Sequence, residues 1–332
     1  MRLLILTKTL NCLGENDAPI MNAFRRLGYE VILGEINTVG AHDYRFFTRG
    51  VLVTRDDDPY FPGDAARGDR ATYFLDEFQL IWVMTQPLDR VARDVWQMLW
   101  LASQNTAFVN SIEGLMFLNT KHALGYLLPK ENRAFSYISN DFSLLWERYR
   151  GAPDQRWVAK PPNTSSGQNV FLLPPNGPNV RTILQCLTGN TDVQNLTSGG
   201  LGGFRAEYAI LQHFIPEVAQ GEKRVIVVRG KVVAWHGRRG NPDDHRSNIT
   251  QGGTLISVEL HSGEIELAEL IGRKLMAHGI NFFGMDMAYP YVLEIEIANP
   301  GGLYDAALAS GVDRSDQAAE LIITHFKQHY TS

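Results

Sequence analysis

Cysteine, positive charge and long apolar runs are all scarce in this sequence. Only Cys12 and Cys186 occur among 332 residues, far apart and without metal-ligand spacing, which argues against a disulfide framework and a zinc site. Lys and Arg total 31 against 36 Asp and Glu, so the chain has no basic field for nucleic acid or an anionic membrane. The opening apolar run spans four residues, too short for a signal peptide, and no later segment approaches a membrane span. We expect a cytoplasmic protein with no nucleic-acid or membrane partner.

A glycine-rich dinucleotide motif is also missing. After the first apolar run the sequence reads LTKTLNCLGEN, without G-x-G-x-x-G, which argues against a dinucleotide-dependent dehydrogenase. The composition is otherwise that of a globular protein, with 44% hydrophobic and 20% charged residues. A chain of this length and composition is expected to form two or three domains.

The first part of the chain alternates between strand and helix patterns. RLLILT predicts a strand, and DAPIMNAFRRLGYEVILGEI predicts a helix that begins at Asp17 and stops at Gly28 before another strand. QLIWVMT, DRVARDVWQMLWLASQ and AFVNS predict a buried strand, a helix and a short strand. We therefore expect a parallel, doubly wound α/β domain up to about residue 119.

The remainder has the alternating pattern of antiparallel strands, which indicates α+β construction. The predicted strands lie in RWVAKPP, NVFLLPP, YAILQHFIP, KRVIVVRGKVVAWHG, GTLISVEL and NFFGMDMAYPYVLEIEIANPGG. The last of these reads as a hairpin that carries Asp286, Glu294 and Glu296 among apolar neighbours. Glu294 and Glu296 point to one face because they are two apart in a strand, and a short turn would place Asp286 opposite Glu294. Either the three acids face water, or a hard dication such as Mg²⁺ sits between them.

Two further polar segments could meet an anion. Lys160 ends a strand before the small-residue loop NTSSG, whose backbone N–H groups could receive a phosphate, although such loops are commonly only turns. The other segment is basic and could face an anionic substrate, a triphosphate or solvent. It contains Lys223, Arg224, Arg238, Arg239 and Arg246.

Taken in order, these motifs resemble the prokaryotic glutathione synthetases, which are ATP-grasp carboxylate–amine ligases. FVNSIEGLMFLNTKHALGYL and VAKPPNTSSG resemble the segments that carry the two ATP lysines of the family. ILQHFIPEVAQGEKRVIVVRGK resembles its adenine hinge, ribose-binding acid and active-site arginine. RSNITQGG is similar to R-G-N-x-x-x-G-G, and MDM and EIEIANP are similar to the metal segments. The resemblance is weak in the N-terminal part and clear from about residue 107 to 302.

The resemblance implies a set of site residues. Those for ATP are Lys121, Lys160, Ser165, Ser166, Gly167, Gln212, His213, Phe214, Ile215 and Glu222. Those for Mg²⁺, or Mn²⁺ in its place, are Asp286, Glu294 and Glu296. Those for catalysis are Arg224, Arg239, Asn248 and Gly253, with Arg246 and Gly252 beside them.

It also implies a fold and an assembly. The N-terminal doubly wound (pre-ATP-grasp) domain would cover residues 1–119, an ATP-grasp lid subdomain residues 120–211, and a C-terminal catalytic subdomain residues 212–332. The expected assembly is a homo-oligomer, either a dimer or a tetramer.

The implied activity joins a small-molecule acid to an amine. The acid would take the γ-phosphoryl group of ATP, and the amine would displace phosphate from the acyl phosphate to leave an amide. In the family the substrates are γ-glutamylcysteine and glycine. Here Glu296 stands where the family usually has Asn, MTQPLDR replaces its R-x-D-P-P segment, and GGLYDAA replaces basic and acidic residues after the last metal strand. A ligase for other amino acids or a specialised metabolite, a non-catalytic ATP-binding module and a small-molecule kinase therefore stay open.

Overall fold

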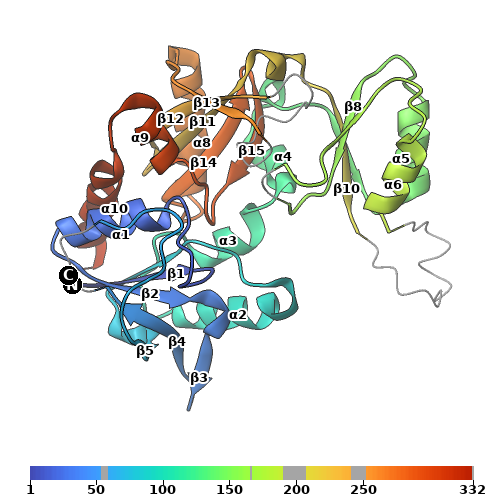
Figure 1. Ribbon diagram of the computed structural model, residues 1–332. Coiled ribbons are helices and arrows are strands. Elements are labelled where there is room, and N and C mark those ends of the chain that lie inside the picture. Colours follow the sequence, from blue (N-terminus) through green and yellow to red (C-terminus); the bar gives the residue numbers. More distant parts are fainter. Residues whose placement is uncertain (54–58, 165–166, 190–206, 241–251, 331–332) are drawn as a thin grey trace.

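The computed structural model describes residues 1–53, 59–164, 167–189, 207–240 and 252–330, in which the strands form three sheets (Figure 1). The strands of the first sheet are β1 (Arg2–Thr7), β2 (Glu30–Glu35), β3 (Gly40–His42), β4 (Arg45–Leu52), β5 (Arg70–Phe74) and β6 (Leu80–Val83). Those of the second are β7 (Ser136–Ser139), β8 (Trp157–Lys160), β9 (Phe171–Leu173) and β10 (Ala209–His213). Those of the third are β11 (Glu222–Val228), β12 (Lys231–Arg239), β13 (Thr254–Ile256), β14 (Phe282–Ala288) and β15 (Tyr291–Glu296).

Helices cover these sheets and connect them. They are α1 (Asp17–Arg26), α2 (Asp89–Ala102), α3 (Ile112–Leu118), α4 (Leu124–Leu127), α5 (Phe142–Arg150), α6 (Val180–Leu187), α8 (Ser262–Met276), α9 (Leu303–Ser310) and α10 (Ser315–Tyr330). Short 3₁₀ helices span Ile36–Thr38, Leu75–Glu77, Lys121–Ala123, Lys130–Asn132 and Pro216–Gln220. None of the described helices is long and apolar enough to cross a membrane.

The first sheet has the order β3-β4-β2-β1-β6, with β5 paired to β4. Its centre is parallel as predicted, because β1 pairs with β2 and β6 in the same direction. Strands β3, β4 and β5 extend it in antiparallel fashion, so the sheet is mixed, whereas the sequence predicted a parallel one. AFVNS was predicted as a strand but contributes only one bridge, between Phe108 and Ile81.

The two faces of β1 enter different cores. Leu4 and Leu6 pack in a cluster with Val95 and Leu99 of α2. Leu3 and Ile5 belong to the cluster that includes α1 and α10. The last helix therefore covers the first sheet, and Figure 1 shows α10 beside α1. The doubly wound arrangement predicted for this region is confirmed.

The second and third sheets are antiparallel, as the alternating patterns predicted. The second has the order β7-β10-β8-β9 and packs against α5 and α6. The third has the order β13-β12-β11-β14-β15. The predicted boundary between residues 211 and 212 falls inside β10, so we propose a division into three parts in which the second boundary follows His213.

Candidate active site

Two buried lysines lie close together between the second and third sheets. Lys121 and Lys160 are 9% and 7% exposed. The Lys121 ammonium lies 2.7 Å from Glu294 Oε1 and also donates to the carbonyl oxygen of Thr164. Burial, followed by the positive charge of Lys121, lowers the pKa of Lys160 to about 8. Paired buried cations of this kind are suited to an anion with several charges, such as a polyphosphate.

An apolar slot continues from the lysines. It is a cavity of about 110 Å³ whose apolar lining comes from Val158, Val170, Phe214, Ile215, Val218 and Leu293. Gly167, Glu222 and both lysines also line it. An apolar slot with charged groups at one end has the character of a nucleotide pocket, in which a flat base would lie against the apolar side chains.

Two predicted adenine-hinge residues have other contacts. Gln212 donates through Nε2 to Ser136 Oγ at 3.0 Å. The ring of His213 packs edge-on against Trp157, with centroids 4.5 Å apart. Of the four predicted hinge residues, Phe214 and Ile215 line the slot, whereas Gln212 and His213 are not among its lining side chains.

An arginine cluster surrounds Asp286 in the third sheet. The register between β11 and β14 places Arg224 opposite Asp286. Arg224 Nε and Nη2 donate to Asp286 Oδ1 and Oδ2 at 2.5 and 2.8 Å, and Arg238 also contacts Oδ1. Although burial opposes ionisation, Arg224 and Arg238 hold the pKa of Asp286 well below its usual range. The aspartate therefore stays charged and fixes two guanidinium groups beside the lysines.

The predicted catalytic residue Arg239 and its neighbour Arg238 lie in different surroundings. Successive residues of a strand point to opposite faces, and in β12 Arg238 is buried whereas Arg239 is exposed. Arg238 also lies 3.7 Å from Glu222, its register partner in β11. Arg238 lines the larger cavity described below, and Arg239 does not.

The three predicted metal ligands do not gather as one set. Asp286 lies opposite Glu294, which confirms the predicted register, but both Asp286 oxygens accept from arginine. The described residues contain no group of three or more His, Cys, Asp or Glu side chains that could hold a metal. Burial and then the charge of Glu294 raise the pKa of Glu296 to about 7. Glu294 and Glu296 alone therefore fit a Mg²⁺ ion, because this metal commonly takes one or two carboxylates together with substrate phosphates.

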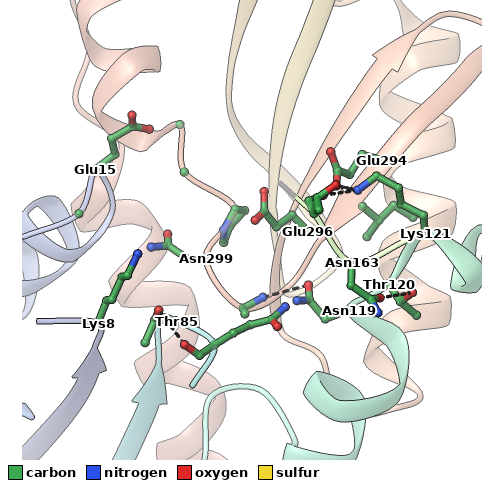
Figure 2. Close-up of a pocket in the computed structure, with 18 of the residues that line it drawn as sticks. Lys8, Glu15, Thr85, Asn119, Thr120, Lys121, Asn163, Glu294, Glu296 and Asn299 are labelled. Atoms are coloured by element: carbon green, nitrogen blue, oxygen red, sulfur yellow. Dashed lines mark hydrogen bonds and ion pairs between the residues drawn. The ribbon is translucent and has the colours of Figure 1, made fainter. Parts of the chain in front are cut away.

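A larger cavity of about 630 Å³ opens between the first and third sheets (Figure 2). Lys8 and Glu15 reach it from the loop after β1, and Thr85 from the end of β6. The carboxyl ends of parallel strands commonly form ligand sites. Arg224, Arg238, His236, Glu296, Asn299 and Asp305 line it from the third sheet and the segment that follows.

Some predicted residues lie elsewhere. Ser165, Ser166, Arg246 and Asn248 lie outside the described residues. Gly252 and Gly253 precede β13 and line neither of these two cavities.

Sequence reasoning passed over several cavity residues. They are Lys8, Glu15, Thr85, Asn119, His236, Asn299 and Asp305. For Lys8, Glu15 and Thr85 a signal was available, because they follow the predicted parallel strands. His236 lies two residues before Arg238 in the same strand, so strand alternation places the two side chains on one face.

Comparison with known proteins places these features in a family. Residues 136–310 match the sequence profile described as "Prokaryotic glutathione synthetase, ATP-grasp domain". A glutathione synthetase of Gloeobacter violaceus is 24% identical over 341 aligned positions, which cover 98% of this chain and 97% of that protein. A glutathione synthetase of Rhodopseudomonas palustris is 36% identical over 144 positions, 43% of this chain and 46% of that protein.

Solved structures share the fold at low identity. The D-cycloserine synthetase DcsG has a TM-score of 0.65 at 13% identity, with 98% of this chain and all of that chain covered. An ATP-grasp RimK domain protein from Sphaerobacter thermophilus has a TM-score of 0.59 at 16% identity, with 97% and 99% covered. These likenesses confirm the ATP-grasp fold expected from the motifs.

Proposed function

This chain belongs to the prokaryotic glutathione synthetase family of ATP-grasp ligases, and from that premise we propose that its apolar slot holds ATP and its larger cavity the carboxylate substrate. It is an ATP-dependent carboxylate–amine ligase that uses Mg²⁺. The observation that carries the proposal is the continuity of the two cavities, since both are lined by Lys121, Thr164 and Glu294. The γ-phosphoryl group of ATP bound in the slot would therefore face the larger cavity.

The proposed roles follow from charge and position. Phe214 and Ile215 would flank the base, and Glu222 would accept from the ribose. Lys121 and Lys160 would bind the phosphates. Mg²⁺, held by Glu294 and Glu296, supplies charge neutralisation at the phosphate oxygens when it is bound.

The arginines act on the other side of the reacting group. Arg224 and Arg238 line the larger cavity and are oriented by Asp286. We assign them the stabilisation of negative charge on the acyl phosphate and on the oxyanion formed when the amine attacks. Fixed donors of this kind need no reorganisation during the reaction, which is why buried arginines are effective there.

The substrates are a small-molecule acid and an amine, and γ-glutamylcysteine with glycine is the pair we propose first. A ligase for another acid and amine is the second candidate, because Glu296 adds a carboxylate at the metal position and the segment that lines the cavity after β6 begins with the uncharged Thr85 and Gln86. We further propose a cytoplasmic location, consistent with the free, exposed Cys12 and Cys186, and a homo-oligomer, a dimer or tetramer.

An ADP-release assay over pairs of acids and amines tests the proposal. We expect release that requires both partners, beginning with γ-glutamylcysteine and glycine. Release with an alcohol acceptor and no amine would indicate a kinase instead. Tight ATP binding without release for any pair would indicate a non-catalytic module.

A further inference from the structure

Glu15 and Asp305 are two carboxylates on one wall of the larger cavity, where the charges of Arg224 and Arg238 act on both of them from a distance. Glu15 precedes α1, and Asp305 lies in the first turn of α9; both line the cavity. Within the described residues, no lysine or arginine forms an ion pair with either. The nearest basic group to Asp305 is His236, whose Nε2 lies 3.9 Å from Oδ2. Lys8 reaches the same cavity but is exposed and pairs with neither carboxylate.

A glycine turn lets Glu15 occupy this position. Gly301 and Gly302 have φ of +62° and +100°, conformations that other residues rarely adopt. A Cβ atom on Gly301 would lie 3.0 Å from Glu15 Oε2. A larger residue there would therefore be strained and would press on the glutamate, so the turn leaves room for Glu15 over the start of α9.

The same wall of the cavity also carries buried hydrogen-bond acceptor atoms to which no group donates within the described residues. His236 is 2% exposed and lines the cavity, and its Nδ1 has no hydrogen-bond partner within the described residues. Burial, and then the charges of Arg238 and Arg224, lower the pKa of His236 to about 3. The ring is therefore neutral and keeps one acceptor nitrogen. Asn299 Oδ1 is also a buried acceptor without a partner. Buried polar atoms are usually paired, so this wall is suited to a ligand that brings N–H donors.

We propose that Glu15 and Asp305 bind an ammonium group on the carboxylate substrate, so that the ligase selects acids that carry a free amino group. This inference rests on the proposed function of the larger cavity. Figure 2 shows Glu15 and Asn299 on the side of the cavity opposite Lys121 and Glu294. Because the reacting carboxylate must meet the γ-phosphoryl group beside Lys121, an ammonium at Glu15 belongs to the remote end of the acid.

The electrostatics of the wall agree with this assignment. Loss of water raises the pKa of Glu15 and the charge of Asp305 raises it further, while Arg224 and Arg238 oppose this in part. Loss of water also raises the pKa of Asp305, against the smaller opposing effect of Arg238 and Arg224. A bound ammonium offsets both effects and forms charge-assisted hydrogen bonds with the carboxylates.

Binding calorimetry with acids in matched pairs tests the proposal. The probes are γ-glutamylcysteine, alanylalanine and the N-acetyl derivative of each, titrated into the full chain with Mg²⁺ and a non-hydrolysable ATP analogue. Acetylation removes the positive charge and leaves the reacting carboxylate intact. We expect at least one free acid to bind about tenfold or more tightly than its acetylated form, and Glu15→Gln with Asp305→Asn to reduce this ratio to about twofold.

The control is Asp89→Asn, which neutralises one carboxylate elsewhere in the same cavity, and each of Glu15→Gln and Asp305→Asn alone is its single-charge match. The ratio should persist in that variant. Equal binding of free and acetylated acids, no binding of either free acid, or an equal loss of the ratio in Asp89→Asn would overturn the proposal. Failure of the proposed ligase function would be seen separately, as absence of ADP release in the assay described above.

Discussion

Lys160 and Arg238 are both buried cations, but their surroundings give them different chemistry. Burial and the neighbouring Lys121 bring the pKa of Lys160 to about 8, so its charge depends on pH near neutrality. Arg238 stays charged because guanidinium cannot be deprotonated in proteins. Lys160 can therefore take up a proton when an anionic ligand binds, whereas Arg238 supplies a charge that does not change.

ATP binding should become weaker as the pH rises above about 8. The folded-state pKa of Lys160 is lowered, so above this pH the free protein has a neutral lysine, while a bound phosphate favours the charged form. ATP binding should then take up a proton, with affinity falling up to about tenfold per pH unit. Calorimetry at pH 9 in buffers of different ionisation enthalpy measures this uptake. Lys160→Met should bind weakly without uptake, and uptake in that variant would assign the proton elsewhere.

Arg238→Met should lower turnover by about 100-fold or more, because it removes a fixed donor from the reacting groups. Arg239→Met should stay within about twofold, since its side chain is exposed on the other face of β12. Steady-state ADP release at saturating ATP compares the two variants. Similar losses in both would restore the sequence-based choice of Arg239.

At the scale of elements, strand alternation explains why the sequence placed Glu294 and Glu296 correctly on one face of β15 but did not single out Arg238 in β12. It placed Glu294 and Glu296 on one side of β15, and the structure agrees. The same rule separates Arg238 from Arg239, but the sequence of β12 alone does not say which face is buried. The pairing of Asp286 with Arg224 joins strands that are 62 positions apart, so no local pattern could reveal that Asp286 faces arginines.

Glu296→Asn should raise the Mg²⁺ concentration needed for half-maximal activity while keeping a similar plateau. The substitution removes one of two mutually repelling carboxylates and therefore weakens attraction for a dication. A Mg²⁺ titration of ADP release at pH 8, above the raised pKa of Glu296, compares variant and parent. A collapsed plateau with an unchanged midpoint would instead indicate that Glu296 accepts a proton from the amine.

At the scale of the whole molecule, local patterns predicted elements well and the assembly of elements less well. β1 and the start of α1 match their expected bounds because buried runs and helix-start residues are local signals. The antiparallel strands β4 and β5 were missed because RFFTRGVL and RATYF mix polar and apolar residues. Likewise, the larger cavity unites loops from both ends of the chain, which a local pattern does not describe.

Asn110 connects the first sheet to the third and should be important for stability. Its Nδ2 donates to the carbonyl oxygens of Phe282 and Ile297 at 2.8 and 3.1 Å, and its Oδ1 accepts from the N–H groups of Asn281 and Phe282 at 2.8 and 3.0 Å. Asn110→Ala leaves these buried groups unpaired and should lower the free energy of unfolding by about 3 kcal/mol. Urea denaturation measures the change, and the exposed Asn105→Ala serves as control. Equal midpoints for the two variants would contradict this role.

The packing of α10 has a consequence for how the chain acquires its structure during synthesis. Ala318, Ile322 and Phe326 share one core cluster with Leu3 and Phe24, so the outer layer of the first sheet is supplied by the last helix. Nascent domains generally fold in the order in which they leave the ribosome. Here β1 and α1 emerge long before α10, so the part of their apolar surface that α10 covers stays open until that helix has been made. The core of the first sheet is therefore completed only after all the strands of the third sheet have been made.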